Sequence, residues 1–186
     1  YDKRKNHLLL IKAASTLCKQ YNFTLTLVGE VVNKTHKVQK EKLLREINDN
    51  NMLNICHLQN TIPFYEICNL YIEHDVFILP ARDEPASISL LEAMGCGLPV
   101  VCSDTCGTKT YVQEGINGFI FSTDNQLSLS KTMEVFLSKP EKCMEMSEQS
   151  YRYAEENISP EAFYHHFKYM LEKQFNLRLD EGKISD

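Results

Sequence analysis

The sequence has no apolar run approaching the roughly 20 residues that span a bilayer, and no signal peptide opens it. A membrane-spanning protein is therefore not expected, and any membrane contact should be peripheral. With 186 residues, of which 43% are hydrophobic and 24% charged, the chain is long enough for one globular domain with a sizeable core.

Disulfide frameworks and zinc-binding motifs are also missing. The seven cysteines are odd in number, lie scattered through apolar segments and include no C-x-x-C pair. Cys102 and Cys106 are the closest pair, but no second Cys or His pair stands at metal-ligand spacing. We therefore predict reduced, structural thiols in a cytoplasmic protein, and no metal site.

Charge of one sign is not in large excess. The chain has 20 Lys and Arg against 25 Asp and Glu, which gives a formal net charge of -5. It therefore offers no overall cationic field to attract a polyphosphate backbone, and we expect no nucleic-acid partner.

Helix-like and strand-like apolar patterns alternate along the chain. We predict helices at about 6–20, 37–48, 64–71, 87–94 and 127–137, from 140, and at 160–177. We predict strands at 24–28, 54–58, 75–80, 99–103 and 118–121, with the continuous apolar run 75–80 as the central one. This order predicts an α/β fold: a Rossmann-like open parallel sheet with helices on both faces, closing with C-terminal helices.

Two local expectations refine the first helices. Asn6 is available as the N-cap of the first helix. In the second helix, one side is expected to carry the apolar residues Val38, Leu43, Leu44 and Ile47.

The start of the chain indicates a fragment. It begins at Tyr1 without Met, and a helix-like pattern starts within a few residues, which leaves no room for the strand that usually opens an α/β domain. We therefore expect a truncated first strand, one domain at residues 1–177, and a charged, flexible tail at 178–186.

The segment from Glu84 to Val101 carries the chemistry, because it places two carboxylates beside apolar neighbours just after the expected central strand. Eight positions at about 100° each leave Glu84 and Glu92 on different helical faces, so Glu84 belongs in the loop and Glu92 inside the helix. A helix beginning near Ser87 presents free N–H groups at the carboxyl edge of the sheet, which suits a phosphate. Glu92, about a turn further in, is placed to accept hydrogen bonds from a ribose diol.

Here the sequence resembles the retaining glycosyltransferases with the GT-B fold, of the glycosyl transferases group 1 type. Their C-terminal, donor-binding domain carries two glutamates separated by seven residues, and Glu84 and Glu92 match that E-x7-E spacing. The resemblance covers most of the chain, through residues 5–7, 27–29, 75–80, 92–101 and 115–121.

The resemblance implies a role for each matching residue. Glu92 holds the ribose hydroxyls, Glu84 is the catalytic residue that contacts the donor sugar, and Lys5 binds phosphate. Backbone amides around Ala86, Ser87 and Ile88 approach the sugar and the diphosphate. The prediction for Gly107 comes from its position and not from the resemblance: it is first a turn glycine, and because it follows the strand ending near Ser103 it can also let backbone approach the donor.

The same resemblance implies a sugar transfer from a nucleotide diphosphate sugar to a hydroxyl acceptor, with the anomeric configuration retained and with no metal or other cofactor. The acceptor-binding N-terminal domain is expected to lie outside this chain, together with any peripheral membrane association, so the fragment alone is expected to be inactive. The family's second phosphate-binding cation falls just before Tyr1. The chain departs from the family where Phe-Gly is usual, at Ala86-Ser87, and where Glu is usual, at Thr110.

Other interpretations stay open. A nucleotide-sugar epimerase or a phosphorylase relative shares the fold, and a noncatalytic nucleotide-binding or assembly domain fits the Ala86-Ser87 departure. At single residues, Glu92 can be a solvated surface residue, Glu84 can favour a helix dipole, and Lys5 can belong to a solvated cationic turn.

Overall fold

The computed structural model describes residues 1–175, apart from the side chains of Phe64 and Phe175. Its strands are β1 (Leu25–Val28), β2 (Cys56–Gln59), β3 (Phe77–Leu79), β4 (Val100–Ser103) and β5 (Gly118–Phe121). Its α-helices are α1 (His7–Leu17), α2 (Lys34–Asp49), α3 (Phe64–Ile72), α4 (Ile88–Gly95), α5 (Gln126–Ser138), α6 (Glu141–Asn157) and α7 (Pro160–Phe175). The predicted tail, 178–186, lies outside the described residues.

Each predicted helix and strand within these residues is present, with ends displaced by a few residues. Two 3₁₀ helices, η1 (Lys3–Lys5) and η2 (Gly107–Tyr111), are additions that the sequence pattern did not indicate. Both lie beside the candidate site described below.

All the strand pairs are parallel, as predicted, but the strands form two sheets. β1 pairs with β2, whereas β3, β4 and β5 form a three-stranded sheet in that order. The prediction that the strand at 75–80 is central is therefore wrong, because β4 lies between β3 and β5. An apolar run indicates a strand that is buried on both faces. All four residues of β4 are buried, whereas only one of the three residues of β3 is, so β4 fits this description better.

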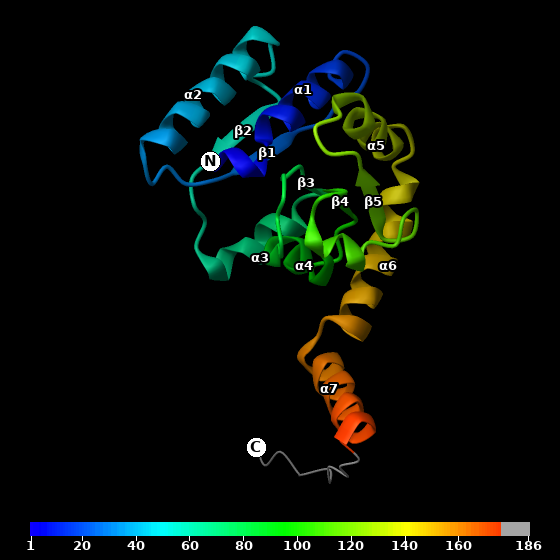
Figure 1. The fold of residues 1–186 in the computed structure, drawn as a ribbon. Coiled ribbons are helices and arrows are strands. Elements are labelled where there is room, and N and C mark those ends of the chain that lie inside the picture. Colours follow the sequence, from blue (N-terminus) through cyan, green and yellow to red (C-terminus); the bar gives the residue numbers. More distant parts are fainter. Residues whose placement is uncertain (176–186) are drawn as a thin grey trace.

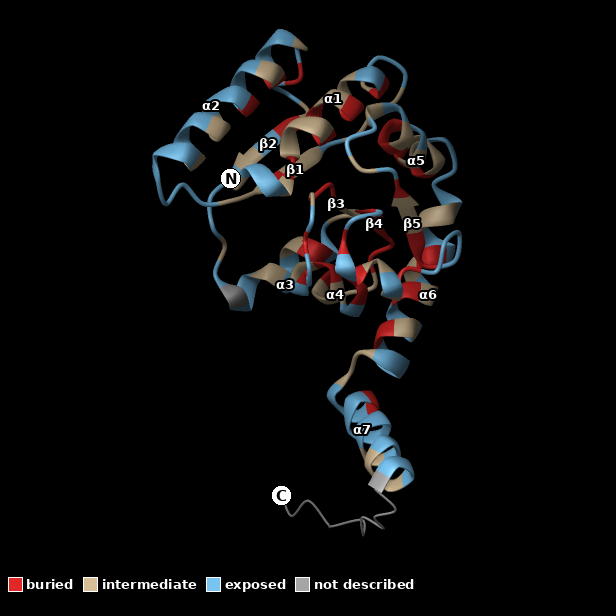
Figure 2. Ribbon diagram, viewed as in Figure 1, coloured by how far each residue is buried: buried red, intermediate tan, exposed pale blue. Residues whose placement is uncertain are grey.

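Helices cover both faces of the three-stranded sheet (Figure 1). Alternate β4 side chains enter two different cores: Val101 joins a cluster with residues of α1, α2 and α5, whereas Val100 and Cys102 join a cluster with residues of α3, α4 and α6. Figure 2 shows the buried residues on the strands and on the helix faces turned toward them. The predicted α/β architecture is thus confirmed.

The last helix differs from the others in its surroundings. α7 extends away from the rest of the molecule (Figure 1), and of its described residues only Ala162 is buried. Its exposed aromatic residues include Phe163, Tyr164, Phe167 and Tyr169.

Two local predictions need correction. Asn6 occupies the N-cap position of α1, but in a left-handed conformation with φ 52°, and its side-chain amide donates to Asp124 Oδ1 at 3.1 Å instead of capping the helix. In α2 only Leu43 and Ile47 are buried, because the helix touches the core along a narrow stripe and leaves Val38 and Leu44 outside it.

Candidate functional site

Glu84 lies in the loop after β3 and forms an ion pair with Lys5. The Lys5 Nζ donates to Glu84 Oε2 at 2.7 Å, and the Glu84 side chain is only 11% exposed. A backbone hydrogen bond of 2.7 Å from Arg82 N to Arg4 O ties this loop to η1. The contact therefore joins two predicted site residues that are 79 positions apart in the sequence.

Gly107 supports the same loop through its backbone. Its N–H donates to the Glu84 carbonyl oxygen at 2.8 Å. A Cβ at this position would lie 1.9 Å from the Pro85 carbonyl oxygen, a distance too short for any residue with a side chain. Glycine is thus required here because two segments of the protein backbone approach each other closely. An approach of Gly107 to a donor stays a prediction.

The N-terminus of α4 follows the Glu84 loop directly in the sequence. Ser87 is its N-cap and is 3% exposed, yet its side chain makes no capping hydrogen bond within the described residues; its Oγ lies 2.9 Å from Ser89 Oγ instead. Ala86 is exposed, and Ile88 is 71% exposed. The start of this helix therefore borders solvent with its first backbone donors uncapped by the serine, as a phosphate site requires.

Glu92 lies one turn into α4 and is partly buried. Its Oε2 accepts a hydrogen bond of 3.1 Å from the hydroxyl of Tyr71, a residue of α3 that is 7% exposed. Burial, followed by the nearby Glu92 carboxylate, raises the pKa of Tyr71 above its ordinary value. Glu92 is thus held by a specific neighbour instead of extending freely into solvent.

Two buried thiols lie behind the Gly107 turn. Cys106 Sγ is 3.0 Å from Thr108 Oγ1, and a hydrogen bond from the Cys102 thiol lowers the pKa of Cys106 to about 6. The same hydrogen bond raises the pKa of Cys102. No group of three or more His, Cys, Asp or Glu residues arranged to hold a metal ion is found within residues 1–175.

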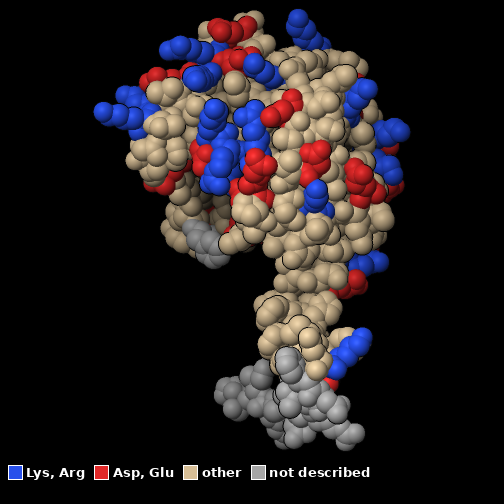
Figure 3. Space-filling model, in the orientation of Figure 1, with Lys and Arg blue, Asp and Glu red and all other residues tan. Residues whose placement is uncertain are grey.

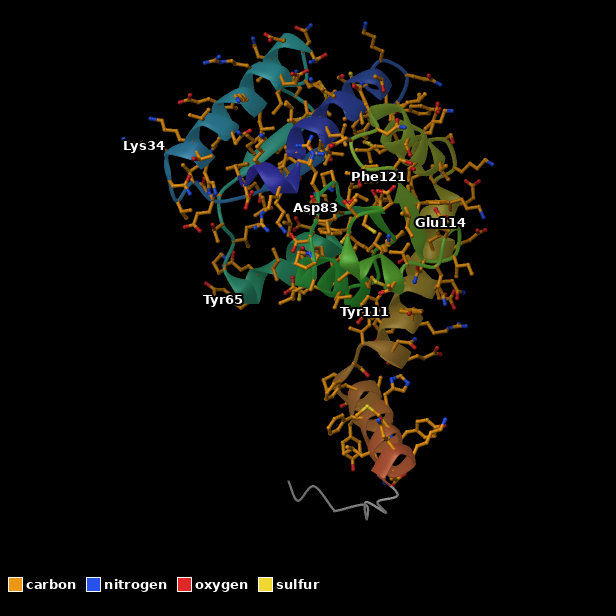
Figure 4. The ribbon with its side chains drawn as sticks, in the orientation of Figure 1. Lys34, Tyr65, Asp83, Tyr111, Glu114 and Phe121 are labelled. Carbon is orange, nitrogen blue, oxygen red and sulfur yellow. The ribbon has the colours of Figure 1, made fainter. Side chains whose placement is uncertain are left out.

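Basic residues gather beside this region. A pocket of about 210 Å³ is lined by Lys3, Arg4, Arg82 and Asp83. Figure 3 shows Lys and Arg side chains gathered over η1, and Asp83, labelled in Figure 4, lies beside them. A pocket of about 330 Å³ beside Gly115 and α6 is larger, and neither pocket is lined by a predicted site residue. The smaller one is lined by Arg4 and Asp83, which adjoin Lys5 and Glu84 in the sequence, so we assign a role to neither pocket but place the smaller one next to the candidate site.

In the structure Glu84 contacts both Lys5 and Gly107, and Ala86, Ser87, Ile88 and Glu92 lie in the segment that follows. Their roles toward a ligand stay predictions. Sequence reasoning missed Tyr71 and Arg82. A tyrosine near the end of an apolar helix signals a buried phenol that needs a partner, but the sequence does not say which partner.

Comparison with known proteins now identifies the family. Residues 1–153 match the family described as Glycosyl transferases group 1. The chain belongs to this family. Among curated proteins, an uncharacterized glycosyltransferase of Haemophilus influenzae is 29% identical over 145 residues, which cover 76% of this chain and 38% of that protein.

Solved structures agree on the fold. HepE of Anabaena in complex with UDP matches with a TM-score of 0.81 at 19% identity, over 92% of this chain and 46% of that one. The C-terminal domain of a glycosyl transferase group 1 family protein from Francisella tularensis matches with a TM-score of 0.80 at 17% identity, over 86% of this chain and 83% of that one. The fold is therefore that of the C-terminal domain of GT-B glycosyltransferases. The chain spans less than half of the Haemophilus and Anabaena proteins.

No helix within residues 1–175 combines the length and the apolar character needed to cross a membrane.

Proposed function

We propose that this chain is the donor-binding domain of a retaining glycosyltransferase, which moves a sugar from a nucleotide diphosphate sugar to a hydroxyl acceptor. The observation that carries the proposal is the contact of Lys5 with Glu84 beside the start of α4. This contact joins a cation and a carboxylate, and the N-cap of α4, whose side chain leaves the helix amides uncapped, follows Glu84 by three residues. These are the groups needed to hold a diphosphate and a sugar.

Lys5 and the start of α4 provide the phosphate site. The lysine ammonium has three donors, so it can keep its hydrogen bond to Glu84 and still donate to a phosphate oxygen. The helix amides add the positive end of the helix dipole. Together they stabilise the charge that develops on the departing diphosphate, and the mechanism therefore requires no metal ion.

Glu84 and Glu92 bind two different parts of the donor, the sugar and the ribose. Glu84, held by Lys5 in a nearly buried position, contacts the hydroxyls of the donor sugar and orients its anomeric carbon. Glu92, one turn into α4, accepts hydrogen bonds from the ribose hydroxyls of the nucleotide. That HepE is solved with UDP, and also with UDP-glucose, supports a nucleotide sugar as the donor.

Calorimetric titration of UDP, GDP and ADP into this chain tests the nucleotide site. Glu92→Ala is expected to weaken binding of the preferred nucleotide by about tenfold or more, since each lost hydrogen bond to a charged group contributes about 1.5–3 kcal/mol. Glu156→Ala, at an exposed position of α6, is the matched control and should leave binding unchanged. Absence of binding, or equal effects of the two substitutions, would remove the site.

Glu84 requires a test of transfer with the protein that also contains the acceptor domain. Glu84→Ala is expected to retain nucleoside diphosphate binding and to lose transfer. The anomeric configuration of the product, read from the NMR coupling constant of its anomeric proton, reports on retention. Unchanged turnover of the variant would exclude Glu84 from the active site, and an inverted product would reject the retaining mechanism.

A further inference from the structure

Tyr71 connects the helix before β3 to the carboxylate of Glu92. Its hydroxyl lies 3.1 Å from Glu92 Oε2 and 3.3 Å from the Ser89 carbonyl oxygen, so it meets α4 at both residues. Its ring packs edge-on against Phe77 of β3, with the ring centroids 5.9 Å apart and an interplanar angle of 76°, a geometry that aromatic pairs favour. The phenol is therefore fixed by the sheet on one side and by α4 on the other.

A fixed phenol restricts the Glu92 side chain. A glutamate in a helix has three rotatable torsions, and holding it in one orientation costs side-chain entropy. A hydrogen bond from a rigid, buried donor selects one orientation before any ligand arrives. Ligand binding then avoids part of that ordering cost, which is the general advantage of preorganisation.

The hydrogen bond leaves Glu92 able to bind a diol. An ionised carboxylate has about four acceptor positions on its two oxygens, and the Tyr71 hydroxyl occupies one of them, on Oε2. The whole of Oε1 and the remaining lone pair of Oε2 stay available for two further hydroxyls. Burial and the adjacent carboxylate raise the pKa of Tyr71, so the phenol keeps its proton and remains a donor at neutral pH.

We propose that Tyr71 is a positioning residue, which orients the Glu92 carboxylate so that it accepts both ribose hydroxyls of a nucleoside diphosphate. The inference rests on the proposed function, because it assumes that Glu92 binds ribose. It makes Tyr71 responsible for selectivity between nucleotides that have the ribose hydroxyls and nucleotides that lack them. A tyrosine that served only to pack α3 against α4 would have no such effect.

The test uses Tyr71→Phe, which removes the hydroxyl and keeps the ring. Whichever of UDP, GDP and ADP binds the wild-type chain most tightly is titrated beside its 2′,3′-dideoxy counterpart. Tyr71→Phe is expected to weaken the ribonucleotide by about tenfold and to leave the dideoxy nucleotide unchanged. Tyr153→Phe, at a partly buried tyrosine packed against the same core cluster, is the matched control and should change neither affinity.

The outcomes distinguish a failure of the ribose site from a failure of the role of Tyr71. If the wild type binds the ribonucleotide and its dideoxy counterpart equally, or binds no nucleotide, the ribose site fails and Tyr71 loses its role with it. If the wild type discriminates and Tyr71→Phe discriminates equally well, the ribose site stands and the inference about Tyr71 is wrong. A parallel loss of both affinities in Tyr71→Phe also overturns it, since that pattern indicates structural damage.

A double-mutant cycle gives an independent measurement. In a Glu92→Ala background, Tyr71→Phe is expected to cause no further loss of ribonucleotide affinity, because the group that it positions is gone. Additive losses would show that the tyrosine acts through something other than Glu92.

Discussion

The residue whose replacement is most constrained by geometry is Gly107. Gly107→Ala would place a methyl group 1.9 Å from the Pro85 carbonyl oxygen, where both partners are backbone. The turn and the Glu84 loop must then separate, and we expect a loss of stability of about 1–3 kcal/mol together with loss of nucleotide binding. Thermal unfolding and calorimetric titration measure the two effects.

Gly95→Ala is the matched control for this prediction. Gly95 ends α4, and a Cβ there would meet nothing within 4 Å. The same chemical change should therefore be neutral or stabilising by about 0.4–1 kcal/mol. If the two alanine variants behaved alike, the contact between Gly107 and the Glu84 loop would not matter for folding or binding.

The free energy of unfolding is expected to depend on pH through His7. Burial, followed by the positive charges of the chain's N-terminus and Lys5, lowers the pKa of His7 from 6.5 to about 4. Because the folded state holds the neutral ring, the unfolded state binds the proton first as the pH falls. The contribution of His7 to the unfolding free energy is thus fully present above pH 6.5 and is lost as the pH falls toward 4, which lowers the unfolding free energy by up to ~3 kcal/mol.

Urea denaturation at several pH values between 7.5 and 4 measures this slope. His7→Gln should flatten it, since the variant has no ring to protonate, and the same change at exposed His57 controls for the loss of an imidazole. An unchanged slope in His7→Gln would show that other groups cause the acid sensitivity.

Among the secondary-structure elements, those with a long apolar period could be predicted from the sequence, and the 3₁₀ turns could not. α5 and β5 were found within one residue of their predicted bounds, because local periodicity specifies them. η1 and η2 are too short to show a period. The order of the strands depends on contacts between distant segments, which explains why β3 was wrongly predicted to be central.

In the candidate site, too, some features could be predicted from the sequence and others could not. The positions of Glu84 in a loop and Glu92 inside a helix followed from their spacing, and the structure agrees. The partners of these residues did not follow, because Lys5 and Tyr71 reach them across 79 and 21 positions of the chain. Sequence patterns identify the acidic groups, whereas the groups that hold them depend on tertiary packing.

α7 is predicted to contribute little to the stability of the domain. Of its described residues only Ala162 is buried, and stability in a fold follows buried apolar contacts. Removing residues 160–186 should lower the helical circular dichroism signal and shift the melting temperature by only about 2 °C or less. A fall of more than about 5 °C would show that α7 packs against the body of the domain in solution.

For the whole molecule, the two sheets are expected to unfold together. One cluster of buried residues includes Ile11 of α1, Leu27 of β1, Val101 of β4 and Phe121 of β5, so it spans both sheets. His74 adds a polar link, since its Nε2 lies 2.8 Å from Thr26 Oγ1 of β1. A shared core of this kind favours a single cooperative transition, in which the calorimetric and van't Hoff enthalpies are equal.

Ile11→Ala tests this cooperativity from one side of the shared core. Ile11 is 0% exposed, so truncation should cost about 2–5 kcal/mol, whereas the same change at Ile72, which is 70% exposed on α3, should cost under about 0.5 kcal/mol. If the sheets unfold as one unit, amide hydrogen exchange in β4 should accelerate as much as in β1, although Ile11 lies in a helix that precedes both. Faster exchange confined to β1 and β2 would mean that the sheet of β3, β4 and β5 is stable by itself, and that the site at its edge survives damage to the first two strands.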